Sequence, residues 1–226
     1  MKRYLTKSRF KLALECPAKL YYDGKPEYAN QKLGDPFLQA LADGGFQVGA
    51  LAKCYFAGGY DIETLDYYEA LKQTNEFLQR DNVIIYEAAV NFENLFIRAD
   101  ILVKNKDKLE LIEVKAKSFN REKDDFITKN GTITSSWHEY IADVAFQKYA
   151  LSKAFPEYSI EAYLMLADKS AVCPTEGLNQ KFKIGKEKNG RTRISVSFDI
   201  TAEDLTPMIL TKVNVDEYCD IIQRAF

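Results

Sequence analysis

The sequence has a single histidine, His138, and four widely spaced cysteines that form no Cys-x-x-Cys pair. One imidazole excludes any mechanism that needs two, and the scattered cysteines argue against a compact zinc site. Free thiols are typical of a reducing compartment, so we expect a cytoplasmic protein. The glycine pairs at 44–45 and 58–59 lack the Lys-Ser/Thr of a phosphate-binding loop, which argues against an ATP-driven motor in this chain.

Long apolar runs and an excess of positive charge are also missing. No uninterrupted apolar stretch approaches the length of a membrane span, and no hydrophobic region of a signal peptide follows the basic N-terminus, so we expect neither membrane association nor secretion. The 31 Lys and Arg residues face 33 Asp and Glu, for a net charge of −2, which excludes a globally basic nucleic-acid binder. With 226 residues, of which 46% are hydrophobic, the chain fits one domain with a substantial core.

The hydrophobic pattern that is present predicts an α/β protein. Periodicity and turn residues predict helices at 8–22, 36–56, 64–80, 136–155 and 201–226, and strands at 83–92, 95–104, 108–117 and 159–168. Ser8 or Thr6 is available as the first N-cap, Pro17 predicts a break, and Gly44-Gly45 leaves open whether the second helix is one piece or two. Three meandering strands followed by a helix and a strand predict a mixed central sheet flanked by helices.

The chain reads as a single domain over 1–226, in three consecutive parts. A mainly helical part covers 1–80, an α/β core covers 83–170, and a hairpin with a C-terminal helix covers 180–226. The sequence shows no internal repeat or long linker, and it does not indicate an oligomeric state.

A basic β-hairpin is predicted at KFKIGKEKNGRTR, residues 181–193, with its turn at Asn189-Gly190. Six Lys and Arg residues stand here against one Glu. Either this is a solvated edge hairpin protected by lysines, or it contacts phosphates of a nucleic acid. In the second case Lys186, Lys188 and Arg191 are the candidate contacts.

Three charged residues interrupt apolar strands in RADILVKNKDKLELIEVKAKS, residues 98–118. Alternation puts Glu113 and Lys115 on the core face of one strand, and Asp100 lies on a core-like face of the strand before it. They are either a structural ion pair at a sheet edge or a site for a hard cation. In the second reading Asp100, Glu113 and the main-chain carbonyl of Val114 supply oxygen ligands.

The cation-site reading carries a specific chemistry. Two close carboxylates repel each other unless a cation lies between them, and Mg²⁺ or Mn²⁺ prefers such oxygen ligands. Lys115 would then hold a water or stabilise charge on a phosphate. These are the parts needed for metal-assisted hydrolysis of a phosphodiester.

These residues resemble the PD-(D/E)xK nuclease superfamily, with Asp100 followed by Glu113-Val114-Lys115. LTKSRFKLALECPAKLYY, residues 5–22, is similar to the opening of RecB-like nuclease domains, which are related to CRISPR-associated exonucleases. IIYEAAVNFENLFIRADILVK, residues 84–104, looks like the strand pair before the catalytic Asp, and DVAFQKYAL, residues 143–151, resembles the downstream helix with its Gln motif. The matches come in family order over roughly residues 5–170.

The resemblance implies a restriction-endonuclease-like core and a metal-dependent deoxyribonuclease that acts on DNA with Mg²⁺ or Mn²⁺. Glu87 and Gln147 match recurring family positions and would assist Asp100, Glu113 and Lys115. Among the lysines near these motifs, Lys53 and Lys117 are further candidate contacts to nucleic acid.

The sequence also departs from the family pattern. Relatives often place a metal-binding His four residues after a helical Gly; here Gly49 is followed at that spacing by Lys53. Cys16 matches the first cysteine of iron–sulfur relatives, but Cys173 and Cys219 are scattered, so we expect no cluster. The alternative is therefore a catalytically inactive nuclease-fold domain that binds DNA or a partner. Similar domains open longer proteins, so further domains of a longer parent are also expected. An α/β protein with an unrelated ligand is a third alternative, for which the sequence offers no positive feature.

Overall fold

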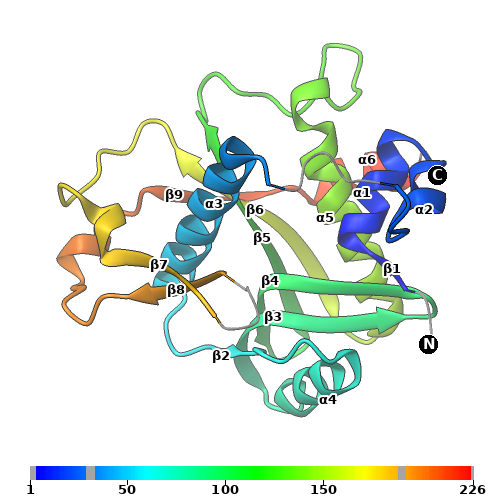
Figure 1. Cartoon of the computed structure of the whole chain (residues 1–226), viewed down its shortest axis with the longest axis horizontal. Helices are drawn as coiled ribbons and strands as arrows, with labels where there is room; N and C mark the ends of the chain where they lie inside the picture. The colour runs from blue at the N-terminus through cyan, green and yellow to red at the C-terminus, as the bar shows by residue number, and fades with distance from the viewer. Residues whose placement is uncertain (1–3, 29–33, 188–191, 225–226) are drawn as a thin grey trace.

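The computed structural model of the chain describes residues 4–28, 34–187 and 192–224. Its centre is a mixed sheet of seven strands with helices on both faces, which confirms the predicted α/β class (Figure 1). Three long antiparallel strands lie side by side in sequence order: β3 (Asn82–Phe92), β4 (Leu95–Asn105) and β5 (Lys108–Phe119). The polar turns between them stand where the sequence predicts them.

The sheet continues beyond β5 through a crossover. Helix α5 (Ser135–Ala154) leads to β6 (Ser159–Asp168), which is parallel to β5, and β9 (Leu210–Asn214) pairs antiparallel with β6 at the edge. At the other edge β2 (Tyr60–Asp61) pairs parallel with β3. The crossover helix and β6 agree with the prediction, whereas β2 is too short to leave a pattern in the sequence.

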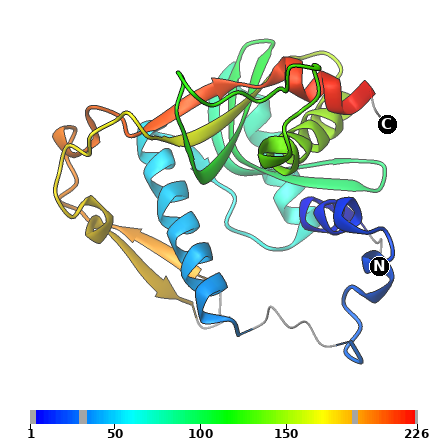
Figure 2. The same ribbon diagram turned by 90° about the horizontal axis from the view of Figure 1, so that it is seen from above.

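Each face of the sheet has its own apolar layer. Figure 2 shows the helices on the two sides of the sheet. Leu102 and Leu111 are register partners on the face covered by four helices: α1 (Lys7–Glu15), α4 (Tyr67–Leu78), α5 and α6 (Asp216–Arg224). Ile101 and Ile112 are partners on the opposite face, which α3 (Pro36–Tyr55) covers. Because successive side chains of a strand point to opposite faces, the continuous apolar runs of β4 and β5 follow from this double cover.

The N-terminal segment enters the sheet before it forms a helix. Strand β1 (Leu5–Thr6) pairs parallel with β4 at Leu95 and Phe96. The side chain of Thr6 then accepts a hydrogen bond from the backbone N–H of Arg9 at 3.4 Å, so Thr6 rather than Ser8 is the N-cap of α1. Helix α1 ends before Pro17, as predicted, and the short α2 (Lys19–Tyr22) follows.

Helix α3 runs unbroken through Gly44-Gly45, so the two-piece alternative is wrong. Asp35 caps its first turn by accepting from the N–H groups of Phe37 and Leu38, and Pro36 occupies its first position. These start signals and the packing of its later turns on the sheet outweigh the low helix propensity of two glycines.

We expect Gly44→Ala to raise the free energy of unfolding by about 0.5–1 kcal/mol, because alanine is the better helix former. A Cβ at Gly44 meets no atom within 4 Å. Urea unfolding measures the effect. Gly59→Ala is the matched control with the opposite sign, since a Cβ there would overlap the ring of Tyr86. A destabilising Gly44→Ala would contradict a continuous helix.

The predicted C-terminal helix is wrong in its first half. Residues 201–226 contain a 3₁₀ turn at Glu203–Leu205, the strand β9 and only then α6. Pro207 cannot lie inside a helix, and the β-branched residues Thr211 and Val213 pair with β6 instead. This strand leaves little local signal because its pairing partner is distant in sequence.

The predicted hairpin is present as β7 (Phe182–Lys186) and β8 (Thr192–Val196), which form a separate two-stranded sheet. Figure 2 shows it beside α3, where Phe182 is buried and Ile194 packs against the same apolar layer. The predicted turn at Asn189-Gly190 lies outside the described residues. Within the described part of the chain, no helix is long and apolar enough to cross a membrane.

Candidate active site

The charged residues of β4 and β5 lie at a fork in the sheet. The pairing of β4 with β5 begins at Asn105 and Lys108 and ends at Ile101 and Ile112. Beyond this point β1, instead of β5, pairs with β4. Asp100 and Glu113 are the next residues on the two diverging strands, and the carboxylate of Asp100 bridges the gap by accepting from the N–H of Val114 at 2.8 Å. We call this point the fork.

Glu113 is the most heavily bonded group at the fork, and its side chain is only 1% exposed. Lys7 donates to both of its oxygens, at 2.9 and 3.1 Å, and Gln147 donates to Oε2 at 2.8 Å. Lys115 donates to Oε1. Burial by itself raises the pKa of this carboxyl, but the two ammonium groups and the hydrogen bonds outweigh it and hold the pKa below its usual range.

A third carboxylate, Asp143, joins the cluster from α5. It accepts from Lys115 at 2.9 Å and from Gln147 at 3.3 Å, and it is as buried as Glu113. Burial and the charge of Glu113 raise its pKa. Asp143 was not predicted, although its spacing of four residues before Gln147 puts both on the same helix face. That spacing is the signal that could have found it.

Lys7 is the second site residue that was not predicted from the sequence. It is the first residue of α1, directly after β1, and its Nζ lies 3.5 Å from Oδ1 of Asp100 as well as beside Glu113. Burial lowers the pKa of its ammonium, but the charges of Asp100, Glu113 and Asp143 raise it well above the usual value. Lys7 belongs to the stretch 5–22 that resembles RecB-like domains, yet nothing local indicates a partner more than 100 residues away.

Asp100 differs from Glu113 in its electrostatics, because its surroundings favour the protonated form. Burial and the charge of Glu113 raise its pKa to about 7, against the smaller opposing effects of Lys7 and Lys115. The charge of Glu87 on β3 adds to the rise. Three carboxyl groups and two ammonium groups meet at the fork, so when all three carboxyl groups are ionised one negative charge lacks a cationic counterpart in the cluster.

Glu87 lies on β3, next to the fork, and its backbone conformation is unusual. The β3–β4 register skips it, passing from Tyr86 opposite Ile101 to Ala88 opposite Ala99. Its φ of 56° lies in the left-handed region, which is strained for a residue with a side chain. The predicted residues Asp100, Glu113, Lys115 and Gln147 are thus brought together, with Glu87 within electrostatic reach.

The raised pKa of Asp100 makes a prediction for the metal-free protein. Its carboxyl has a pKa near 7 when folded and an ordinary value near 4 when unfolded, so between about pH 4 and 7 the folded state holds a proton that the unfolded state has lost. This contribution to stability therefore falls as pH rises through that window. We expect Asp100→Asn, which still accepts from Val114, to be more stable than the wild type at pH 8 by on the order of 1 kcal/mol, with the difference shrinking towards pH 4. Urea unfolding in EDTA at several pH values measures this difference. The prediction would be contradicted if the stability of Asp100→Asn relative to the wild type were lower at pH 8 than at pH 5.

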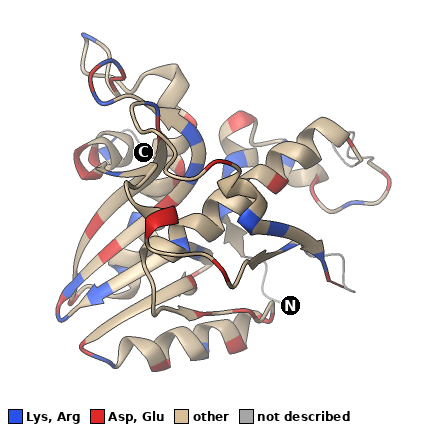
Figure 3. Cartoon of the chain, turned by 90° about the vertical axis from the view of Figure 1, so that its left-hand side faces the viewer, with Lys and Arg blue, Asp and Glu red and all other residues tan. Residues whose placement is uncertain are grey.

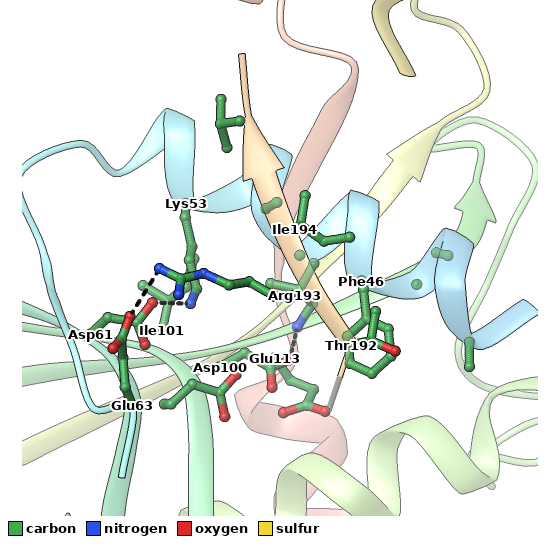
Figure 4. A pocket seen from close by; sticks show the side chains of 18 of the residues that line it. Phe46, Lys53, Asp61, Glu63, Asp100, Ile101, Glu113, Thr192, Arg193 and Ile194 are labelled. Carbon is green, nitrogen blue, oxygen red and sulfur yellow. Dashed lines mark hydrogen bonds and ion pairs between the residues drawn. The ribbon is translucent and has the colours of Figure 1, made fainter. Parts of the chain in front are cut away.

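The fork forms part of the floor of a cleft of about 860 Å³. Helix α3 and strand β8 of the hairpin lie side by side along the cleft, and they contribute Phe46 and Lys53, and Thr192, Arg193 and Ile194, respectively (Figure 4). Two ion pairs lie towards the β2 side: Lys53 with Asp61 at 2.5 Å, and Arg193 with Glu63 at 3.7 Å. The charged residues on this side of the cleft are therefore paired with one another.

The predicted nucleic-acid contacts differ in whether they lie at the cleft. Lys53 lines the cleft, in a pair with Asp61. Lys117 lies elsewhere, over the rings of Trp137 and Tyr140 at 4.6 and 5.0 Å from their centroids. Lys186 ends β7 in an exposed position outside the cleft lining. Lys188 and Arg191 lie outside the described residues.

Arg193, which was not among the predicted contacts, lines the cleft from the described part of the hairpin. Lys, Arg, Asp and Glu are interspersed along the ribbon on the side shown in Figure 3. Strand β8 of the hairpin thus lines the same cleft as the acidic cluster, as the phosphate-binding reading requires.

The donor set at the fork fits a hard cation in its chemistry. Two carboxylates from adjacent strands face a common point, Val114 lines the same cleft, and a cationic group, the ammonium of Lys7, already lies between the carboxylates. In the described residues no group of three or more His, Cys, Asp or Glu side chains is arranged to hold a metal ion. Because the ammonium group of Lys7 lies against oxygens of both carboxylates, binding of a cation by this pair would require Lys7 to move. Cys16, Cys54, Cys173 and Cys219 are free thiols.

The arrangement can hold a proton on Asp100 near neutral pH, and it presents carboxylate and ammonium groups to a ligand in the cleft. Comparisons of the chain with protein-family models, with curated proteins and with solved structures found no match.

Proposed function

We propose that this chain is a metal-dependent deoxyribonuclease of the PD-(D/E)xK type, built on a restriction-endonuclease-like core of β3, β4, β5, α5 and β6. One observation carries the proposal: Asp100, Glu113 and Lys115 converge at the fork and line an open cleft, with Gln147 fixed behind Glu113. A scaffold ion pair at a sheet edge needs neither the cleft nor a third carboxylate.

Asp100 and Glu113 would hold Mg²⁺ or Mn²⁺, with the carbonyl of Val114 as a further candidate ligand. Bound there, the ion would lower the pKa of a water molecule and polarise the scissile phosphate. The fork supplies what such binding needs, because Asp100 is anchored by the N–H of Val114 and Glu113 by Gln147. Both carboxylates are therefore held in place before any ligand arrives.

Lys115 is the group proposed to act on the substrate. Its pKa is raised above the usual value by Glu113 and Asp143, although burial opposes this, so it stays charged at neutral pH. It would stabilise negative charge that develops on the phosphate or hold the attacking water in line. Asp143 and Gln147 position it and Glu113, and Glu87 adds negative potential near Asp100.

The cleft supports a nucleic-acid strand as the substrate. Phe46 and Ile194 offer apolar surface, and Lys53 and Arg193 offer cations whose pairs with Asp61 and Glu63 are partly exposed. Exposed ion pairs are weak, so exchange of these partners for phosphates costs little. DNA is thus the proposed partner, with the hairpin as one wall of its path.

The test is cleavage of DNA by the purified chain. Single- and double-stranded oligonucleotides are incubated with Mg²⁺, with Mn²⁺ and with EDTA, and products are resolved on a denaturing gel. We expect cleavage with either metal and none in EDTA. Cleavage in EDTA, or none with either metal over a range of pH, would overturn the proposal.

A second candidate is favoured by the position of Lys7. An ammonium group between Asp100 and Glu113 already neutralises much of their repulsion, and Lys53 stands where related nucleases place a metal-binding His. The chain would then be an inactive nuclease-fold domain that binds DNA or a partner. DNA binding in EDTA, by fluorescence anisotropy, together with no cleavage in Mn²⁺, would favour this candidate.

A further inference from the structure

Lys7 occupies the point to which both candidate metal ligands are directed. Its Nζ lies 2.9 and 3.1 Å from the two oxygens of Glu113 and 3.5 Å from Oδ1 of Asp100. A divalent cation bound by the same carboxylates would lie about 2.0–2.6 Å from their oxygens. The two cations cannot share that space, because both require the same acceptor oxygens and repel each other at this distance.

The fold fixes the position of the Lys7 backbone but lets its side chain move away from the carboxylates. Leu5 and Thr6 are paired to β4 and Thr6 caps α1, so the backbone of Lys7 is set beside the fork. Its side chain lines the cleft and remains 25% exposed. Four rotatable bonds let the ammonium leave the carboxylates without any change in the sheet.

Lys115 does not share this freedom. It is held in ion pairs with Glu113 and Asp143, whereas in the described part of the chain the ion pairs of Lys7 are with the two candidate ligands, and Asp143 adds an attraction at longer range. Lys7 also lies in the first turn of α1, which has no acidic residue, and a positive charge there is opposed by the helix dipole. Of the two cations, Lys7 is the one that is easier to displace.

We propose that Lys7 is a resident cation that occupies the metal position in the metal-free protein and must be displaced when a divalent ion binds. Exchange of one positive charge for two also balances the cluster, which holds three carboxylates and keeps Lys115. The N-terminal segment thereby sets the metal affinity of the site. This inference rests on the proposed function only in its assumption that Asp100 and Glu113 bind a divalent cation.

The experiment is calorimetric titration of the metal-free chain with Mn²⁺ alone, without DNA. We expect Lys7→Met to bind Mn²⁺ about tenfold more tightly than the wild type, because no ammonium has to be displaced. Lys7→Gln, which can still donate to Glu113, guards against a folding defect and should also bind more tightly. Lys11→Met is the matched control: Lys11 is on the same helix, pairs with Glu139 at 2.6 Å and should leave the affinity unchanged.

The outcomes separate this inference from the proposed function. Wild-type binding and cleavage with Mn²⁺, together with an unchanged or weaker affinity in both Lys7 variants, would overturn the role of Lys7 alone. Absence of Mn²⁺ binding in the wild type and in both variants would overturn the metal site and the inference together. Tighter binding in Lys7→Met and Lys7→Gln but not in Lys11→Met supports the inference, whether or not DNA is cut.

Discussion

Asp100→Asn should lower the rate of Mn²⁺-dependent DNA cleavage by about 10²–10³-fold, the scale found when one electrostatic group of an active site is removed. The amide keeps the shape of the carboxylate and still accepts from the N–H of Val114, so the link between β4 and β5 at the fork is kept. The substitution removes the negative charge with which Asp100, together with Glu113, would bind the cation. Because the same variant is expected to be more stable than the wild type in EDTA at pH 8, a loss of activity cannot be ascribed to unfolding.

The matched control for this substitution is Asp107→Asn. Asp107 is exposed in the turn at the other end of the same β4–β5 hairpin, and the same charge change there should leave cleavage within about twofold of the wild type. Initial rates on a labelled oligonucleotide over a range of Mn²⁺ concentrations measure both variants. Full activity of Asp100→Asn at saturating Mn²⁺ would remove Asp100 from the mechanism.

Glu113→Ala should destabilise the metal-free chain by about 3–5 kcal/mol, the cost of leaving buried charges without their partner. Lys7, Lys115 and Gln147 all donate to Glu113, and the substitution leaves them without their shared acceptor. Native proteins are stable by only about 5–15 kcal/mol, so this loss is a large part of the total. Urea unfolding in EDTA at pH 7 measures it.

A double-mutant cycle identifies the cause. Lys7→Met combined with Glu113→Ala removes an ammonium group that has lost its closest acceptor, so the double variant should be more stable than Glu113→Ala alone. The destabilisation of Glu113→Ala relative to the wild type should shrink at acid pH: the pKa of Glu113 is lowered by folding, so its stabilising contribution is present above the unfolded pKa and is lost as pH falls through the folded pKa. A Glu113→Ala protein within about 1 kcal/mol of the wild type, with additive effects in the cycle, would show that the network adds little to stability.

The expectation for Glu113 differs from what the strands alone suggest. With only Asp100, Glu113 and Lys115 in view, repulsion between the carboxylates predicts that loss of either one relieves strain in the metal-free fold. Lys7 reverses this for Glu113, since it adds a second cation that depends on that carboxylate. For Asp100, whose pKa is raised to about 7, the prediction of relief stands.

Local patterns determined much of the architecture. The alternation and polar turns of residues 83–117 predict β3, β4 and β5, and the periodicity of 136–155 predicts α5. These segments are long, and their backbone groups form hydrogen bonds within the segment or with the next strand in the sequence. The same alternation puts Asp100 and Glu113 on core-facing positions, so the strand pattern alone identifies a buried acidic pair. The Gln motif likewise points to Gln147.

Pairings between distant segments could not be read from the chain. Strands β1 and β9 exist only because β4 and β6 offer open edges, and residues 210–214 look helical or irregular without that partner. The hairpin 181–193 has a local signal for its strands, but its position against α3 and beside the fork follows from packing of Phe182 and Ile194.

By itself, then, the sequence determined an α/β chain with two carboxylates and a lysine in apolar strands, because strand alternation is a local property. Only the tertiary structure decided what surrounds them. The fork between β4 and β5, the entry of Lys7 through β1, and the approach of Asp143 from α5 all depend on long-range packing. Lys7 and Glu113 are 106 residues apart, and partners so distant leave no periodicity in the sequence, although Lys7 contributes to the charge and the pKa values of the site.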